Sequence, residues 1–160
     1  MIDKAGIQEL LPHRHPMLLV DEVREAVPGE SLVAAKAVTA DEPCFQGLVP
    51  GADVAYPPTL LIESWCQAAA LLAVLDAPNP DVLTGRVALF GSIAGLRFGR
   101  PVRPGDVLVH RARLSRLFPD AAMLTGTAEV AGETVLEVDR IVVAFRDAGA
   151  LTGAGAAPAG

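Results

Sequence analysis

The sequence predicts an α+β domain in which an antiparallel sheet packs around one long helix. Three observations lead to this fold class: a long apolar helix at residues 59–75, four consecutive strand-like segments after it, and two strand-like segments before it. Consecutive strands joined by short turns form antiparallel sheets, and a sheet needs a second layer to bury its apolar face. The 160 residues fit one domain, which we place at residues 1–147, followed by a flexible Gly/Ala-rich tail at 148–160.

The part of the chain before the long helix is expected to contain a short helix, a hairpin and a loop. Pro12 ends the first helix, and the Pro28-Gly29 pair is a turn signal between two strands. The loop is rich in Gly and Pro, so we expect it to be ordered but irregular. These elements lie at residues 7–11 (helix), 17–27 and 31–38 (strands) and 42–58 (loop).

The long helix follows Pro57-Pro58 and stops before the breaker Asp-Ala-Pro-Asn-Pro. Thr59 is a candidate for its N-cap. Apolar residues occupy almost every side, a pattern typical of a helix enclosed by protein on all faces. The strands expected after it lie at residues 87–98, 107–117, 122–130 and 134–145, joined by short turn signals.

Composition excludes several functions and locations. The net charge is −6, with 13 Lys and Arg against 19 Asp and Glu, which argues against binding to phosphate backbones and hence against a nucleic-acid partner. No segment has the roughly 20 apolar residues of a membrane span, and the start does not resemble a signal peptide, so we expect a cytoplasmic protein without a membrane partner. Cys44 and Cys66 form no metal-binding pattern and are interpreted as small core residues; no metal is expected.

Glu63 is the only charged side chain in the long helix. An unpaired carboxylate is costly to bury, so it should pair or protonate. Gln67 lies four residues on, on the same helical face, and is placed to hydrogen-bond the carboxylate, while Ser64 is one step round. Two interpretations stay open: a helix-start glutamate that reaches solvent or a loop, and a tuned acid or base.

The histidines give weaker signals. His13 and His15 flank Arg14 in a loop, where hydrogen-bonding histidines are commoner than catalytic ones, and we favour that interpretation. His110 lies in a strand and is expected at the surface or facing a dimer partner. The sequence contains no Gly-x-Ser-x-Gly elbow and no phosphate-binding Gly-rich loop.

Four motifs carry a resemblance to a known family: LPHRHPMLLVDEV at residues 11–23, EPCFQG at 42–47, LLIESWCQAAALL at 60–72 and LRFGRPVRPGDVL at 96–108. In this order and spacing the chain resembles the hotdog-fold 3-hydroxyacyl-(acyl-carrier-protein) dehydratases of type II fatty acid synthesis. The resemblance implies a dimer, a substrate carried on the phosphopantetheine of acyl carrier protein, and no other cofactor. It also implies the fold already predicted, a sheet wrapped around one central helix.

The resemblance further implies that catalysis uses a loop histidine from one subunit and a helix carboxylate from the other. Glu63 matches the carboxylate. The loop reads GLVPG, so Leu48 stands where the histidine is expected, and leucine carries no proton. Pro58 stands where a glycine N–H would polarise the thioester carbonyl, and proline has no N–H. A homodimer should therefore be nearly inactive.

The hypothesis that accounts for these features is a heterodimer in which a hotdog partner supplies the histidine and this chain supplies Glu63, in fatty acyl or polyketide biosynthesis. Arg97, Arg100 and Arg103 are candidates for docking acyl carrier protein, with solvated strand-edge arginines as the alternative. Other candidate functions are a non-catalytic acyl-binding or scaffolding protein and a thioesterase using Glu63. The sequence leaves open the chain length, the pathway and whether the partner is a paralogue.

Overall fold

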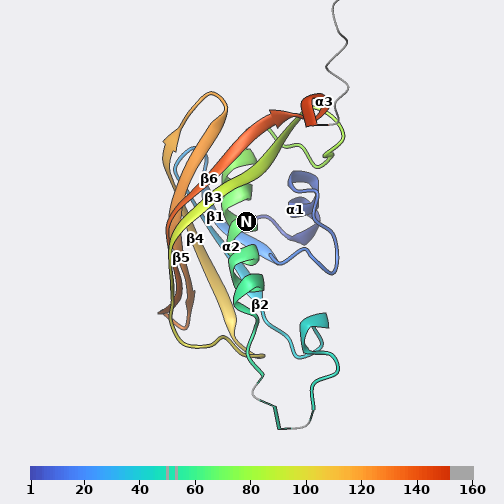
Figure 1. Cartoon of the computed structure of the whole chain (residues 1–160), viewed down its shortest axis with the longest axis vertical. Helices are drawn as coiled ribbons and strands as arrows, with labels where there is room; N and C mark the ends of the chain where they lie inside the picture. The colour runs from blue at the N-terminus through green and yellow to red at the C-terminus, as the bar shows by residue number, and fades with distance from the viewer. Residues whose placement is uncertain (50, 53, 152–160) are drawn as a thin grey trace, which may run out of the picture.

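The computed structural model describes residues 1–49, 51–52 and 54–151. Within them a six-stranded antiparallel sheet, ordered β1-β2-β4-β5-β6-β3, curves around helix α2, as Figure 1 shows. The predicted α+β hotdog architecture is confirmed. The elements in chain order are α1 (Lys4–Leu10), β1 (Glu22–Val27), β2 (Ser31–Ala37), a 3-10 turn (Pro43–Phe45), α2 (Pro58–Val74), β3 (Arg86–Phe98), β4 (Val107–Leu117), β5 (Ala121–Val130), β6 (Glu133–Asp147) and α3 (Ala148–Leu151).

Helix α2 is enclosed by protein, as its composition predicts. Every residue from position 64 to position 72 is buried. The sheet covers one side of the helix, and α1 with the segment after it packs on the other (Figure 1). Trp65, fully buried on the sheet side, anchors this packing through its indole N–H, which donates to the carbonyl of Arg111 on β4. In the described part of the chain, no helix is long and apolar enough to cross a membrane.

Two local expectations are corrected. The N-cap of α2 is Pro57 and not Thr59, because the Pro57 carbonyl accepts the N–H groups of Leu60 and Leu61. The first strand begins at Glu22 and not at residue 17, because the backbone of residues 17–19 is hydrogen-bonded to side chains of α2.

The chain end also differs from a plain tail. Ala148–Leu151 form the short helix α3, and the N–H of Ala148 donates to the carbonyl of Gly85. Ala148 is buried and packs on the domain, whereas residues 149–151 are exposed. The rest of that tail, residues 152–160, lies outside the described residues, and the boundary at 147 stays a prediction.

A close approach between β5 and β4 requires glycine at position 126. A Cβ atom there would lie 1.9 Å from the carbonyl oxygen of Arg111 and 3.1 Å from the ring of Trp65. Backbone cannot yield as a flexible side chain does, so Gly126→Ala is expected to destabilise the fold by about 3 kcal/mol, the upper end for overpacked cores. Urea unfolding measures this, with Gly149→Ala as the control, because a Cβ at Gly149 meets no atom within 4 Å. Equal midpoints for the two variants would contradict the prediction.

Strand β3 forms one edge of the sheet and pairs only with β6 among the described residues. Large apolar side chains on this edge strand are exposed, including Leu89 and Phe90, and its hydrogen-bonding pattern shifts between Phe90 and Ser92. A long edge strand with exposed apolar side chains is a template for pairing with another chain. The fold therefore presents an association surface beside α2.

Candidate functional site

Glu63 lies in the second turn of α2, at the wall of a cavity of about 260 Å³. Its side chain is 32% exposed, so the carboxylate borders protein and solvent at once. The cavity is lined by residues of α2, of β3 around its irregularity, and of β6: Ile62, Glu63, Cys66, Phe90, Gly91, Ser92, Ile93 and Ile141. Burial, and secondarily the charge of Glu63, raise the pKa of the Cys66 thiol to about 12, so at neutral pH Cys66 is an apolar wall and not a nucleophile.

Gln67 holds Glu63 in place. Its Nε2 donates to Glu63 Oε1 at 2.9 Å, which is the hydrogen bond that the four-residue spacing predicts. The amide is itself fixed, because its Oε1 accepts the N–H of Leu19 at 2.8 Å and its Nε2 also donates to the carbonyl of Met17 at 2.7 Å. A flipped amide would lose these bonds, so the donor is directed at the carboxylate.

His13 is the site residue that the sequence analysis missed. Its Nε2 lies 3.5 Å from Glu63 Oε1, the same oxygen that Gln67 contacts. Burial lowers the pKa of His13 and the neighbouring charge of Glu63 opposes that shift, while Arg14 lowers the pKa further. No periodicity links residue 13 to residue 63, because the contact depends on how the segment after α1 packs against α2.

His110 is buried and not at the surface, which corrects the expectation from the sequence. Ser64 Oγ lies 2.6 Å from the carbonyl of Leu19 and 2.7 Å from His110 Nε2. Because the single hydroxyl hydrogen is donated to Leu19, the imidazole carries its hydrogen on Nε2 and donates to Ser64. Ser64 and His110 thus fix the segment at 17–19, which in turn holds Gln67.

Acid is expected to destabilise the protein through His110. Burial, with a smaller effect from Lys36, lowers the pKa of His110 to about 3. An ordinary unfolded imidazole takes up its proton near pH 6.5, so the unfolded state binds more protons between pH 6.5 and pH 3. The neutral imidazole of His110 makes its full contribution to the free energy of unfolding above the unfolded pKa. This contribution is lost as the pH falls through the range, by at most about 1.4 kcal/mol per pH unit.

The measurement is urea unfolding at several pH values in that range for the natural chain and for His110→Asn. Carboxylates titrate in both proteins, so the difference between the two slopes isolates the imidazole. Parallel pH dependences would contradict the prediction.

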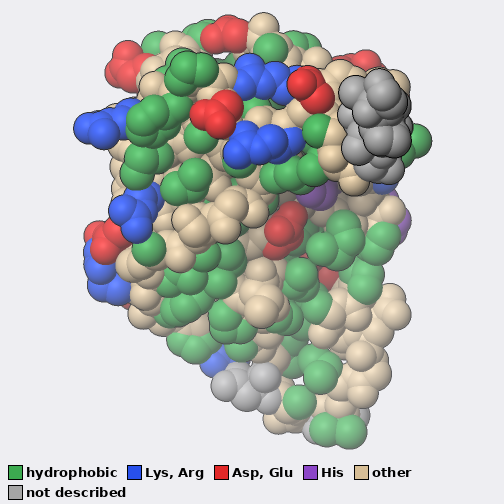
Figure 2. All heavy atoms as spheres, turned by 45° about the horizontal axis from the view of Figure 1, so that its top comes forward, with side chains coloured by type: hydrophobic (Ala, Val, Ile, Leu, Met, Phe, Trp, Pro, Cys, Tyr) green, Lys and Arg blue, Asp and Glu red, His purple; other side chains and the backbone are tan. Residues whose placement is uncertain are grey.

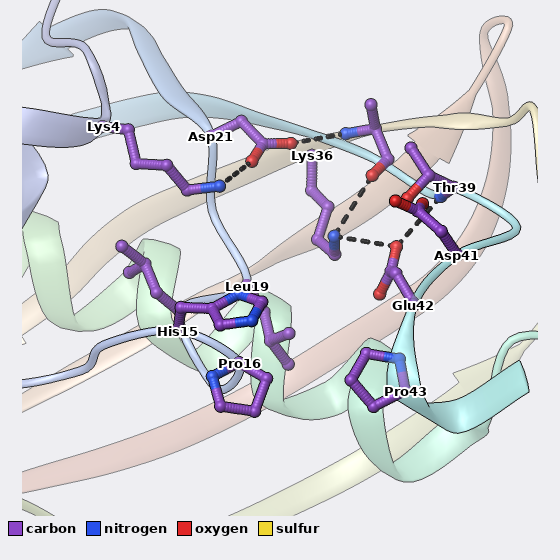
Figure 3. A pocket seen from close by; sticks show the side chains of 12 residues that line it. Lys4, His15, Pro16, Leu19, Asp21, Lys36, Thr39, Asp41, Glu42 and Pro43 are labelled. Carbon is purple, nitrogen blue, oxygen red and sulfur yellow. Dashed lines mark hydrogen bonds and ion pairs between the residues drawn. The ribbon is translucent and has the colours of Figure 1, made fainter. Parts of the chain in front are cut away.

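A second cavity, of about 300 Å³, is polar and is shown in Figure 3. Both lysines that line it pair with carboxylates: Lys4 with Asp21 at 2.7 Å, and Lys36 with Glu42 at 3.0 Å. Glu42 also accepts the N–H of Thr39. The Lys36–Glu42 pair and the Thr39 hydrogen bond tie the end of β2 to the start of the irregular loop, so they are structural and orient the loop that contains position 48.

Leu48 and Pro58 are the two positions at which the sequence departs from the catalytic pattern of the family it resembles. Leu48 is half exposed, in the irregular loop after the 3-10 turn. Pro58 is the first residue of α2. Its ring leaves no N–H at that position, so the helix start offers one donor fewer than a glycine would give.

The arginines proposed for docking are engaged within the chain. Arg97 pairs with Glu137 and Asp139 on β6, and Arg100 pairs with Asp106 and Glu133. On the face shown in Figure 2, basic and acidic side chains likewise lie beside each other. A carrier protein that docks at Arg97 and Arg100 would therefore compete with carboxylates of this chain.

Residues 11–139 match the FabA-like domain. The chain belongs to the FabA-like family. Among curated relatives, the FabA-like chain is 44% identical over 133 residues to "3-hydroxyacyl-[acyl-carrier-protein] dehydratase FabZ" of Enterococcus faecalis, covering 83% of this chain and 91% of the relative. The FabZ protein of Thiobacillus denitrificans is 39% identical over 146 residues, covering 91% and 99%. The family resemblance stated from the motifs is confirmed.

Solved structures support the fold of this FabA-like chain. "The Dehydratase Heterocomplex ApeI:P from Xenorhabdus doucetiae" superposes with a TM-score of 0.74 at 17% identity, over 92% of this chain and 95% of that one. A hypothetical thioesterase with coenzyme A from Streptococcus pneumoniae gives a TM-score of 0.57 at 12% identity, over 79% and 85%. At these identities the likeness establishes the shared fold alone.

Proposed function

We propose that this chain is a subunit of a 3-hydroxyacyl-acyl-carrier-protein dehydratase and contributes Glu63 to a composite active site. The observation that carries the proposal is the oriented carboxylate of Glu63 at a cavity bordered by the sheet edge β3. The relatives named FabZ, 44% and 39% identical, support the reaction class. In fatty acyl or polyketide synthesis the substrate would arrive on the phosphopantetheine of acyl carrier protein.

The reaction needs an acid and a base on adjacent carbons. A base removes the C2 proton, which the thioester carbonyl makes acidic, and the electron pair of the C2–H bond forms the C2=C3 double bond. The C3–O bond breaks, and Glu63 in its acid form donates a proton to the departing hydroxyl, which leaves as water. Gln67 fixes the carboxyl for this transfer.

The base is assigned to a partner subunit. Leu48 cannot take up a proton, and Pro58 cannot donate an N–H to the thioester carbonyl. A hotdog partner paired at the exposed edge of β3 would border the Glu63 cavity and supply both groups. The Xenorhabdus neighbour, a dehydratase heterocomplex by its title, supports the idea that such subunits combine.

The experiment is dehydration of a 3-hydroxyacyl carrier-protein thioester, followed by product mass. It compares this chain alone with the same chain coexpressed with a His-bearing hotdog subunit of the same genome. We expect no turnover alone and turnover typical of enzymes from the coexpressed pair. Full activity of the chain alone would overturn the composite site. Release of free thiol without dehydration would favour the thioesterase alternative.

Carrier docking gives a separate prediction. We propose that Arg97, Arg100 and Arg103 face the acidic surface of acyl carrier protein, so Arg103→Glu should raise KM for the carrier-bound substrate and leave kcat unchanged. A short pantetheine thioester, which lacks the carrier, should show no change. Arg24→Glu, on β1 at the opposite edge of the sheet, is the control. An equal KM effect for both thioesters would contradict docking at this surface.

A further inference from the structure

Two side chains of the same chain converge on one oxygen of Glu63. Gln67 Nε2 lies 2.9 Å and His13 Nε2 3.5 Å from Oε1, and among the described residues Oε2 has no hydrogen-bond partner. Both His13 and Glu63 are about one-third exposed, at 29% and 32% of their side chains. Glu63 lines the cavity of about 260 Å³ and His13 lies beside Glu63, so solvent reaches both side chains.

The surroundings of His13 select one tautomer. His13 Nδ1 is buried and has no hydrogen-bond partner among the described residues. A hydrogen on Nδ1 would leave a buried N–H unpaired, whereas a hydrogen on Nε2 faces a carboxylate. The imidazole thus presents an N–H donor to Glu63 Oε1.

The backbone around His13 is fixed by hydrogen bonds from the side chain of Arg14. The Arg14 guanidinium donates to three carbonyl oxygens, those of Gln8, Leu11 and His13 itself. Leu11 is buried in the core, so this short segment is fixed to the end of α1. The contact between His13 and Glu63 is therefore built into the fold.

We infer that His13 is a positioning residue for the reaction: with Gln67 it holds Oε1 of Glu63 and leaves Oε2 directed to the substrate hydroxyl. This inference rests on the proposed function and deepens it, because it places an imidazole of this chain at a site whose base comes from the partner. Besides Glu63 on α2, the charged groups near His13 are Arg14 beside it and Arg86 on β3. Arg86 and His13 both line a small cavity that is separate from the Glu63 cavity.

The first test uses the assembled enzyme, this chain with its His-bearing partner. His13→Ala should lower kcat about 10- to 100-fold with little change in KM, because the contact of Nε2 with Oε1 is lost and the carboxyl is less well oriented for proton transfer. His13→Gln should restore most of kcat, since its amide reaches about as far as Nε2, and the shorter His13→Asn should not. His15→Ala, two residues away at the polar cavity, is the control and should keep full activity.

The second test needs no activity. The imidazole titrations of His13 and His15 are followed by NMR in the natural chain and in Glu63→Gln. Losing the negative charge should lower the pKa of His13 further.

The outcomes separate the inference from the proposed function. If the assembled enzyme is inactive but the pKa of His13 shifts in Glu63→Gln, the dehydratase proposal is refuted and the contact between His13 and Glu63 stands. An active enzyme unaffected by His13→Ala overturns the inference, and so does an unshifted titration. Failure of His13→Gln to restore kcat also overturns it, because the imidazole would then act by carrying a proton and not by positioning.

Discussion

Replacing Glu63 with glutamine in the assembled dehydratase is expected to lower kcat by about 10²- to 10⁴-fold, the usual cost of removing a general acid or base. Glutamine keeps the size of the side chain and still accepts the Gln67 hydrogen bond through its amide oxygen. It has no acidic proton for the leaving hydroxyl, so the chemical step and not binding should suffer. Steady-state kinetics with the carrier-bound substrate measures both.

The control for this prediction is Asp76→Asn, a carboxylate-to-amide change just beyond the C-terminal end of α2. It should leave kcat and KM at their natural values. If Glu63→Gln retained more than about a tenth of kcat, well above the range for lost acid catalysis, Glu63 would have no role in proton transfer.

Returning a histidine to position 48 and a glycine to position 58 is expected to give the chain alone dehydratase activity at least about 10²-fold above its own background. The pair of substitutions supplies the two groups that the sequence lacks, a base in the loop and an N–H at the start of α2. Leu48 is 48% exposed, so an imidazole fits there without disturbing the core.

The same double variant carrying Glu63→Gln is the matched control and should stay inactive. Activity that survives Glu63→Gln would show that the new histidine works without the helix carboxylate. Absence of any gain from Leu48→His with Pro58→Gly would contradict the assignment of the missing base to position 48.

The sequence predicts most of the fold because the signals are local. The strand-like segments and the largely apolar character of α2 depend on neighbouring residues, and the turn signals between strands are local as well. The start of β1 does not depend on neighbouring residues. The backbone groups of residues 17–19 hydrogen-bond to Ser64 and Gln67, some 45 to 50 positions away. Sequence periodicity carries no information on such a pairing.

The sequence predicts only part of the candidate site. A lone carboxylate in an apolar helix identifies Glu63, and helical spacing identifies Gln67. The sequence does contain a signal for the burial of His110. Side chains alternate between the two faces of a strand, so His110 lies on the same face as the apolar residues Leu108 and Ala112, which are both buried. For His13 there was none, because its contact with Glu63 exists only once the segment after α1 is packed.

The place of β3 at the rim of the sheet has a consequence for how much enzyme a cell contains. In the proposed assembly, each pairing along that strand yields one active centre only when the neighbour brings a histidine. Two copies of this chain that pair with each other would occupy the same edge and yield none. Copies of this chain in excess of the His-bearing subunit would be inactive. The amount of the His-bearing subunit would therefore set the capacity for dehydration.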